Sequence, residues 1–250
     1  MQRIYLSDIA FTQELVITQK ELYHQITRVM RAKVGQKYAF FDGITQQDFI
    51  YEIQSIDKQK VIFQLVEIQE KHTELPLSLH LFQSLPHKLE KREYIIEKWV
   101  EVGYRSFVFF PSERSQKIIV SESKKQRLKK IMIEALEQCG GNILPELYFI
   151  ENNIILQWGS EYLQKVQYEW GIKNIFCHTK TQDIWNLSGL HLKKFENIWI
   201  YIGPEGWFTD REVESMKEKG YTWVNFWSRI LRCETVSSVL WFYLHQKKED

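Results

Sequence analysis

The stretch that most limits the fold of this chain is the apolar run Ile198–Ile202, which leads directly into the turn Gly203-Pro204-Glu205-Gly206. A continuous apolar run of this length is typical of a strand that is buried on both faces of a parallel sheet. Beyond the turn, the T-x-x-E pattern of Thr209 and Glu212 predicts a capping box, and Gly220 predicts the end of the helix that it opens. The sequence therefore predicts a strand, a glycine turn and a capped helix.

The chain after residue 72 alternates between segments that favour strands and segments that favour helices. Strands are expected at 77–84, 106–110, 173–178, 196–203 and 222–227, and helices near 87–102, 124–139 and 236–244. This order is typical of an α/β domain with a mainly parallel sheet. Ligands of such sheets bind at the carboxyl ends of the strands, so the turn after Ile202 is either a ligand site or a plain tight turn.

The first 72 residues follow another pattern, which predicts a small β-barrel-like unit. Strands are expected at 37–43, 47–56 and 60–68, after a helical stretch at 20–35. The spacing of Leu22, Ile26, Val29 and Met30 predicts the inner face of that helix. Its basic residues form either an RNA-binding patch or a solvated face. We therefore expect two domains, residues 1–72 and 73–250.

Composition limits the partners and the compartment. The 33 basic and 32 acidic residues nearly cancel, so a nucleic acid would have to meet a local basic patch. The absence of an apolar run of about 20 residues and of a signal-peptide layout predicts a cytoplasmic protein with no membrane contact. The cysteines Cys139, Cys177 and Cys233 lie far apart, which argues against disulfides and against a zinc or other metal site.

A second motif, "RILRCET", follows the glycine turn by about twenty residues and groups Arg229, Arg232 and Glu234 around an apolar pair. Such a group of charges is rare in a pure core. "IGPEG" followed by "RILRCET" resembles the 16S ribosomal RNA uracil-N3 methyltransferase family of the SPOUT superfamily. The blocks "HQITRVMR", "EKWVEVG", "PSERS" and "ALEQCGG" are similar to that family in the same order, along nearly the whole chain.

The resemblance implies a fold and a cofactor that periodicity cannot show, because knots are nearly absent from proteins. It implies a C-terminal SPOUT α/β domain with a trefoil knot, preceded by a small PUA-like β-barrel that binds RNA, in a homodimer. The cofactor is S-adenosyl-L-methionine. By resemblance, its pocket is formed by His178, Ile202, Gly203, Pro204, Glu205, Gly206, Phe226, Ile230 and Leu231.

The implied substrate is a uridine in 16S rRNA of the small ribosomal subunit, and its chemistry indicates which side chains act. Loss of the N3 proton leaves negative charge on the O2 and O4 oxygens of uracil, which a guanidinium can hold with charge-assisted hydrogen bonds. Arg232 is the candidate for this role. Glu234 either accepts the proton or orients Arg232, and a plain salt bridge between the two is the alternative.

Basic residues at family positions are the candidate RNA contacts. Phosphate contacts of this kind position an enzyme without specifying sequence. The candidates are Arg3, His24, Arg28, Arg31, Lys88, Lys98, Arg114 and Arg127.

Two tryptophans depart from the family pattern, since Trp207 and Trp227 stand where the family has glycine. A bulky indole there would fill the pocket or force a positive φ on a residue that resists it. Three alternatives follow: an active methyltransferase, a non-catalytic RNA-binding relative whose cofactor pocket is blocked, or an unrelated α/β nucleotide-binding enzyme if the block order is coincidence. The chain has only 11 glycines but nine tryptophans. If the source organism reads UGA as glycine and the gene was translated with UGA as tryptophan, both Trp207 and Trp227 would be glycine in the cell. The codons at these two positions distinguish this explanation from real substitution.

Overall fold

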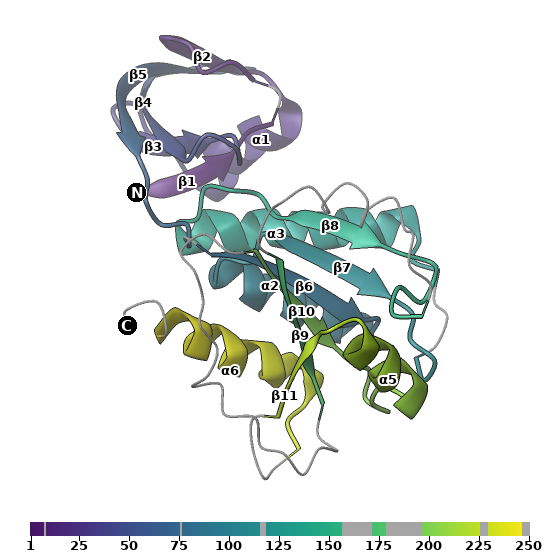
Figure 1. Ribbon diagram of the computed structural model, residues 1–250. Helices are drawn as coiled ribbons and strands as arrows, with labels where there is room; N and C mark the ends of the chain where they lie inside the picture. The colour runs from purple at the N-terminus through teal and green to yellow at the C-terminus, as the bar shows by residue number, and fades with distance from the viewer. Residues whose placement is uncertain are drawn as a thin grey trace. The chain divides into compact units, whose positions relative to one another are not determined.

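The computed structural model describes residues 1–7, 9–75, 77–115, 119–156, 172–178, 197–225 and 230–246. The chain divides into two compact units (Figure 1). Unit 1 consists of Met1–Glu74 and Ile133–Leu144, and unit 2 of Leu75–Met132 and Pro145–Asp250. Among the described residues, no helix combines the length and the apolar character that crossing a membrane requires.

Unit 1 contains a five-stranded sheet in the order β1-β3-β4-β5-β2. Its strands are β1 (Gln2–Tyr5), β2 (Glu14–Ile17), β3 (Lys37–Phe41), β4 (Gln47–Ile56) and β5 (Val61–Glu70). The β1–β3 pair is parallel, and the pairs β3–β4, β4–β5 and β2–β5 are antiparallel. The predicted strands β3, β4 and β5 are confirmed, whereas β1 and β2, with four residues each, are too short for their alternation to be recognised.

The helical stretch of unit 1 differs from its prediction. It consists of α1 (Lys20–His24) and the π-helix η1 (Gln25–Val29). Ile26 is buried as predicted, but Val29 is 69% exposed. The amide of Met30 donates to the carbonyl of Gln25, five residues back, so the turn is wider than that of an α-helix and the predicted apolar spacing is lost. The assignment of Val29 to the inner face is therefore wrong.

Unit 2 contains a six-stranded parallel sheet in the order β11-β9-β10-β6-β7-β8, which confirms the predicted α/β class. The strands are β6 (Ser78–Ser84), β7 (Ser106–Phe110), β8 (Glu146–Phe149), β9 (Ile172–Cys177), β10 (Asn197–Ile202) and β11 (Thr222–Val224). All six residues of β10 are buried between β9 and β6. The buried parallel strand predicted from the apolar run is confirmed, whereas β8 was not predicted.

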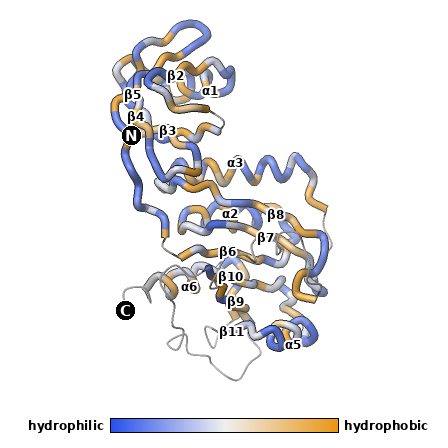
Figure 2. Tube along the Cα trace, turned by 45° about the horizontal axis from the view of Figure 1, so that its top comes forward, coloured by the Kyte–Doolittle hydropathy of each residue, from blue (hydrophilic) through white to orange (hydrophobic). Residues whose placement is uncertain are grey.

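The predicted helices are present as α2 (Leu89–Glu101), α3 (Glu122–Cys139), α5 (Asp210–Glu218) and α6 (Cys233–Gln246). The apolar residues of α3 recur at helical spacing, and in Figure 2 its trace alternates between blue and orange. Leu128, Met132 and Leu136 are nearly fully buried, as expected for an inner face. α6 contacts both α2 and β10, so these three elements pack together in unit 2.

Candidate functional site

The carboxyl ends of β9, β10 and β11 lie at one edge of the sheet in unit 2. Ile202 of β10 pairs with Cys177 of β9, and Cys177 pairs in turn with Val224 of β11. A cavity of about 530 Å³ opens at this edge, which is within the size range of small-molecule sites. The turn after Ile202 is therefore part of a concave site.

Most of the predicted site residues line this cavity. They are His178, Ile202, Gly203, Pro204, Glu205, Ile230 and Leu231 from the cofactor set, Arg232 and Glu234 from the catalytic pair, and Lys88 from the RNA set. Gly206 is exposed next to the cavity wall and does not line it, and Phe226 lies outside the described residues. The cavity wall thus joins segments that lie far apart in the sequence.

The turn itself favours glycine at two positions, by close packing at Gly203 and by backbone conformation at Trp207. A Cβ atom on Gly203 would lie 3.3 Å from the ring of Phe208, closer than side chains normally pack. Trp207 donates its amide to the carbonyl of Pro204 and has a φ of +61°, which costs a residue with a side chain about 1 kcal/mol. Trp207 also lines the cavity, as the sequence led us to expect. Trp227 lies outside the described residues.

The helix that follows the turn is held by the predicted capping box. Thr209 and Glu212 cap α5 reciprocally, and Gly220, at a φ of +74°, follows its end. Both predictions are confirmed. The fully buried Glu212 also accepts hydrogen bonds from the amide of Glu113 and from the side chain of Asn153. The same carboxylate therefore ties the loop at 112–115 to α5.

Charged side chains meet at the mouth of the cavity. The ammonium of Lys91 lies 2.8 Å from Oε1 of Glu205, and Nη1 of Arg232 lies 3.9 Å from Oε1 of Glu234. Arg232 is 83% exposed at its side chain, whereas Glu234 is 16% exposed. Lys91 also lies in the cavity wall, although it is not among the predicted site residues. Its spacing of three residues from Lys88, one helical turn, is the signal that could have identified it.

Glu234 is held in its ionised form. Burial raises its pKa, but the hydrogen bond from the Cys233 thiol and the charges of Lys91 and Arg232 outweigh burial and lower the pKa below its usual value. The carboxylate is therefore ionised at neutral pH, the form that can orient a cation or accept a proton.

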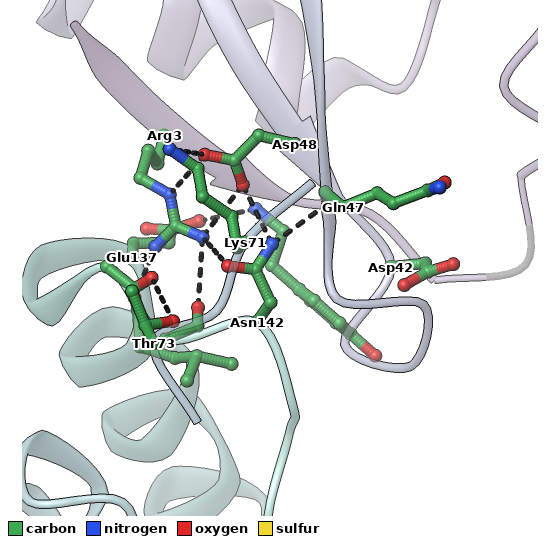
Figure 3. A network of polar contacts seen from close by, with 12 residues as sticks. Arg3, Asp42, Gln47, Asp48, Lys71, Thr73, Glu137 and Asn142 are labelled. Atoms are coloured by element: carbon green, nitrogen blue, oxygen red, sulfur yellow. Dashed lines mark hydrogen bonds and ion pairs between the residues drawn. The ribbon is translucent and has the colours of Figure 1, made fainter. Parts of the chain in front are cut away.

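Arg3 takes part in a polar network inside unit 1 (Figure 3). Its guanidinium donates to both carboxylate oxygens of Asp48, to the carbonyls of Leu136 and Gly141 and to the side-chain oxygen of Asn142. The side chain is 11% exposed and its guanidinium lies over the ring of Phe41. These contacts occupy the guanidinium, and Asp48 already neutralises its charge within unit 1.

The other candidate RNA contacts differ in their surroundings. In unit 1, His24, Arg28 and Arg31 are exposed, and His24 lines a second hollow together with Lys20, Lys58 and Lys60. In unit 2, Lys98 is paired with Glu97 and Glu101, Arg127 with Glu93, and Arg114 donates to the carbonyl of Gly206. Lys60 is paired with Asp57. Within the described part of the chain, Arg28 and Arg31 have no such ion pair, in contrast to Lys98 and Arg127.

The chain is similar to known proteins along most of its length. Residues 73–244 match the model of the RNA methyltransferase domain family. Ribosomal RNA small subunit methyltransferase E of Buchnera aphidicola subsp. Schizaphis graminum (strain Sg) is 31% identical over 93% of this chain and 91% of its own length. The protein of the same name from Bacillus subtilis (strain 168) is 30% identical over 88% of this chain and 84% of its own.

The fold is also similar to that of a solved structure. The crystal structure of a ribosomal RNA small subunit methyltransferase E from Neisseria gonorrhoeae, bound to S-adenosyl methionine, covers 98% of this chain and 97% of its own. Its TM-score is 0.81 at 22% identity, which is a likeness of fold.

Proposed function

Since this chain belongs to the RNA methyltransferase domain family, and within it to the family of ribosomal RNA small subunit methyltransferase E, we propose that it methylates N3 of a specific uridine in 16S rRNA with S-adenosyl-L-methionine as methyl donor. The observation that carries this proposal is the cavity at the end of β10. The turn after Ile202 and the segment that runs from Ile230 into α6 meet there, and these are the two motifs that resemble the family.

The residues of the cavity fit the cofactor. Ile202, Ile230 and Leu231 supply apolar wall for an adenine ring, and Gly203 permits close approach of the backbone. We assign cofactor binding to these residues together with His178, Pro204, Glu205, Gly206 and Phe226. When bound, S-adenosyl-L-methionine supplies an electrophilic methyl group; the chain itself must position and deprotonate the base.

Arg232 and Glu234 are proposed to prepare the uracil. The exposed guanidinium of Arg232 reaches the mouth of the cavity, where it can donate to a uracil oxygen that gains negative charge as N3 loses its proton. The ionised Glu234 is available to accept that proton. Because N3 lies on the Watson–Crick edge, a paired target base must first be exposed.

The wider architecture follows from the same family. We propose that residues 1–72 form a PUA-like RNA-binding domain and residues 73–250 a SPOUT domain with a C-terminal trefoil knot, working as a homodimer. The parallel sheet of unit 2 and the five-stranded sheet of unit 1 support this division. A ribosomal RNA substrate implies work in the cytoplasm, on the small ribosomal subunit.

Replacing Arg232 by alanine should lower the methylation rate at least about tenfold, or roughly 1.4 kcal/mol, because the imide anion loses its guanidinium. The measurement is single-turnover methyl transfer, with calorimetric cofactor affinity as the control. Arg211→Ala, an exposed arginine of α5 that does not line the cavity, is the matched variant and should keep the rate. Unchanged turnover in Arg232→Ala would remove this residue from the mechanism.

Reversing the charge of Arg28 and Arg31 to glutamate should weaken RNA binding and flatten its dependence on salt. Both side chains are exposed, Arg28 on η1 and Arg31 just after it. A chain with fewer phosphate contacts releases fewer counterions when it binds RNA. Filter binding of 16S rRNA at several salt concentrations gives the slope. A slope identical to that of the unaltered chain would show that this surface is a solvated face.

The alternative function is a non-catalytic RNA-binding relative whose pocket Trp207 and Trp227 block. Trp207 lines the cavity, and this observation is the reason to test the alternative. Calorimetry with S-adenosyl-L-methionine separates the two functions, since the enzyme should bind at micromolar to submillimolar cofactor. Absence of binding at millimolar cofactor would favour the blocked relative.

A further inference from the structure

Lys91 lies in the first turn of α2 and in the wall of the cavity. Hydrogen bonds of the neighbouring residue hold the backbone at this point. The neighbouring Arg92 is 2% exposed, and its guanidinium donates to the carbonyls of Pro86 and His87 at 2.8 and 3.1 Å. These bonds hold the segment that leads into α2. The start of α2 is therefore a rigid support for Lys91 at the edge of the site.

A lysine at this point works against the stability of the helix. The first turn of a helix carries partial positive charge, which favours acidic side chains and opposes cations by about 0.3–1 kcal/mol. Lys91 is accommodated by Glu205, whose Oε1 lies 2.8 Å away on the turn after β10. The hydrogen bond to Glu205, followed by the charges of Glu205 and Glu234, raises the pKa of Lys91, so the ammonium stays charged.

The chemistry of uracil N3 calls for more than one cation. The anion formed at N3 spreads its charge over O2 and O4, which flank N3 on both sides. Arg232 is held loosely, 3.9 Å from Glu234 and 83% exposed, and one guanidinium on one side leaves the other oxygen without a charged donor. Lys91 lines the same cavity at lower exposure, 27%, and a less hydrated cation interacts more strongly with an anion.

Resting on the proposed function, we propose that Lys91 is a second cation of the base site, which donates to one uracil oxygen while Arg232 donates to the other. In this role Glu205 balances the charge of Lys91 until the base enters, and Glu234 takes the N3 proton. Lys91 is then a catalytic residue, because it touches the substrate.

The first test is single-turnover methylation of small ribosomal subunits lacking the modification, at saturating subunit concentration and over a range of pH. Lys91→Met should lower the rate at least about tenfold at neutral pH, as the loss of a donor to a developing anion does. The loss should shrink as pH rises, because higher pH ionises N3 without help. Lys91→Arg should recover part of the rate, and cofactor affinity should stay within about twofold.

A double-mutant cycle with Glu205→Gln separates this role from a structural one. If Lys91 contacts the base, the effect of Lys91→Met persists in the Glu205→Gln background. An effect that vanishes in that background, or that disappears at saturating subunits, would overturn the role, since Lys91 would then act through Glu205 or through RNA binding. If the unaltered chain does not methylate the subunits, both the proposed function and this role of Lys91 are overturned. If the unaltered chain methylates them and Lys91→Met does so at the same rate, only this role of Lys91 is overturned.

Discussion

Replacement of Glu212 by alanine is expected to lower the free energy of unfolding of unit 2 by about 3 kcal/mol, the cost of losing a helix cap and leaving buried donors without acceptors. The carboxylate is fully buried. It accepts from the amide of Glu113 at 2.9 Å, from the side chain of Asn153 at 2.7 Å and from the amide of Thr209 at 2.8 Å. All tryptophans of the chain lie in unit 2, so urea unfolding followed by tryptophan fluorescence reports on this unit.

Two variants control for this effect. Glu212→Gln keeps the size of the side chain and one carbonyl acceptor, so it should lower the free energy of unfolding roughly half as much as Glu212→Ala. Arg211→Ala changes the neighbouring residue, whose side chain is 76% exposed, and should cost less than about 0.5 kcal/mol. A loss in Glu212→Ala as small as that in Arg211→Ala would contradict the role of Glu212 in joining the loop at 112–115 to α5.

Replacement of Trp207 by glycine is expected to tighten the binding of S-adenosyl-L-methionine at least about tenfold and to stabilise unit 2 by about 1 kcal/mol. The backbone at Trp207 has a φ of +61°, a conformation that glycine adopts without strain, and the side chain lines the cavity. Calorimetry gives the affinity and urea unfolding the stability.

Trp207→Ala separates the two causes of this effect. Alanine removes the indole from the cavity but keeps a Cβ atom at the positive φ, so it should gain cofactor affinity and little stability. Unchanged or weaker affinity in Trp207→Gly would show that the indole is a cofactor contact and that the pocket is open with tryptophan in place.

The sequence predicted the strand, turn and helix around Gly203 because each rests on local chemistry. A continuous apolar run requires burial on both faces, a T-x-x-E pattern supplies its own cap, and glycine terminates a helix at a positive φ. The side chains of Thr209 and Glu212 need no distant partner to cap α5. The wall of the cavity, by contrast, needed the family resemblance to be predicted.

Features that depend on distant partners could not be predicted. From the sequence alone, Arg3 is predicted to be a basic surface residue. Its partners Asp48 and Asn142 lie 45 and 139 positions away along the chain, and only the fold brings them next to it. From the sequence alone, Lys91 is one of several charges on a solvated helix, whereas in the fold its ammonium donates to the side chain of Glu205. Val29 follows a helical spacing that the π-helix alters. For Arg3 and Lys91 the pattern along the chain carries no information on which segments meet, and for Val29 it does not distinguish a π-helix from an α-helix.

The central claim is that the cavity at the end of β10 serves methyl transfer to N3 of a uridine in 16S rRNA. The most direct test incubates the purified chain with labelled S-adenosyl-L-methionine and small ribosomal subunits that lack the modification, followed by digestion of the RNA and identification of the methylated nucleoside. The account predicts 3-methyluridine at a single position of 16S rRNA. Transfer to another base or another atom, or no transfer by a chain that binds both cofactor and subunit, would contradict it.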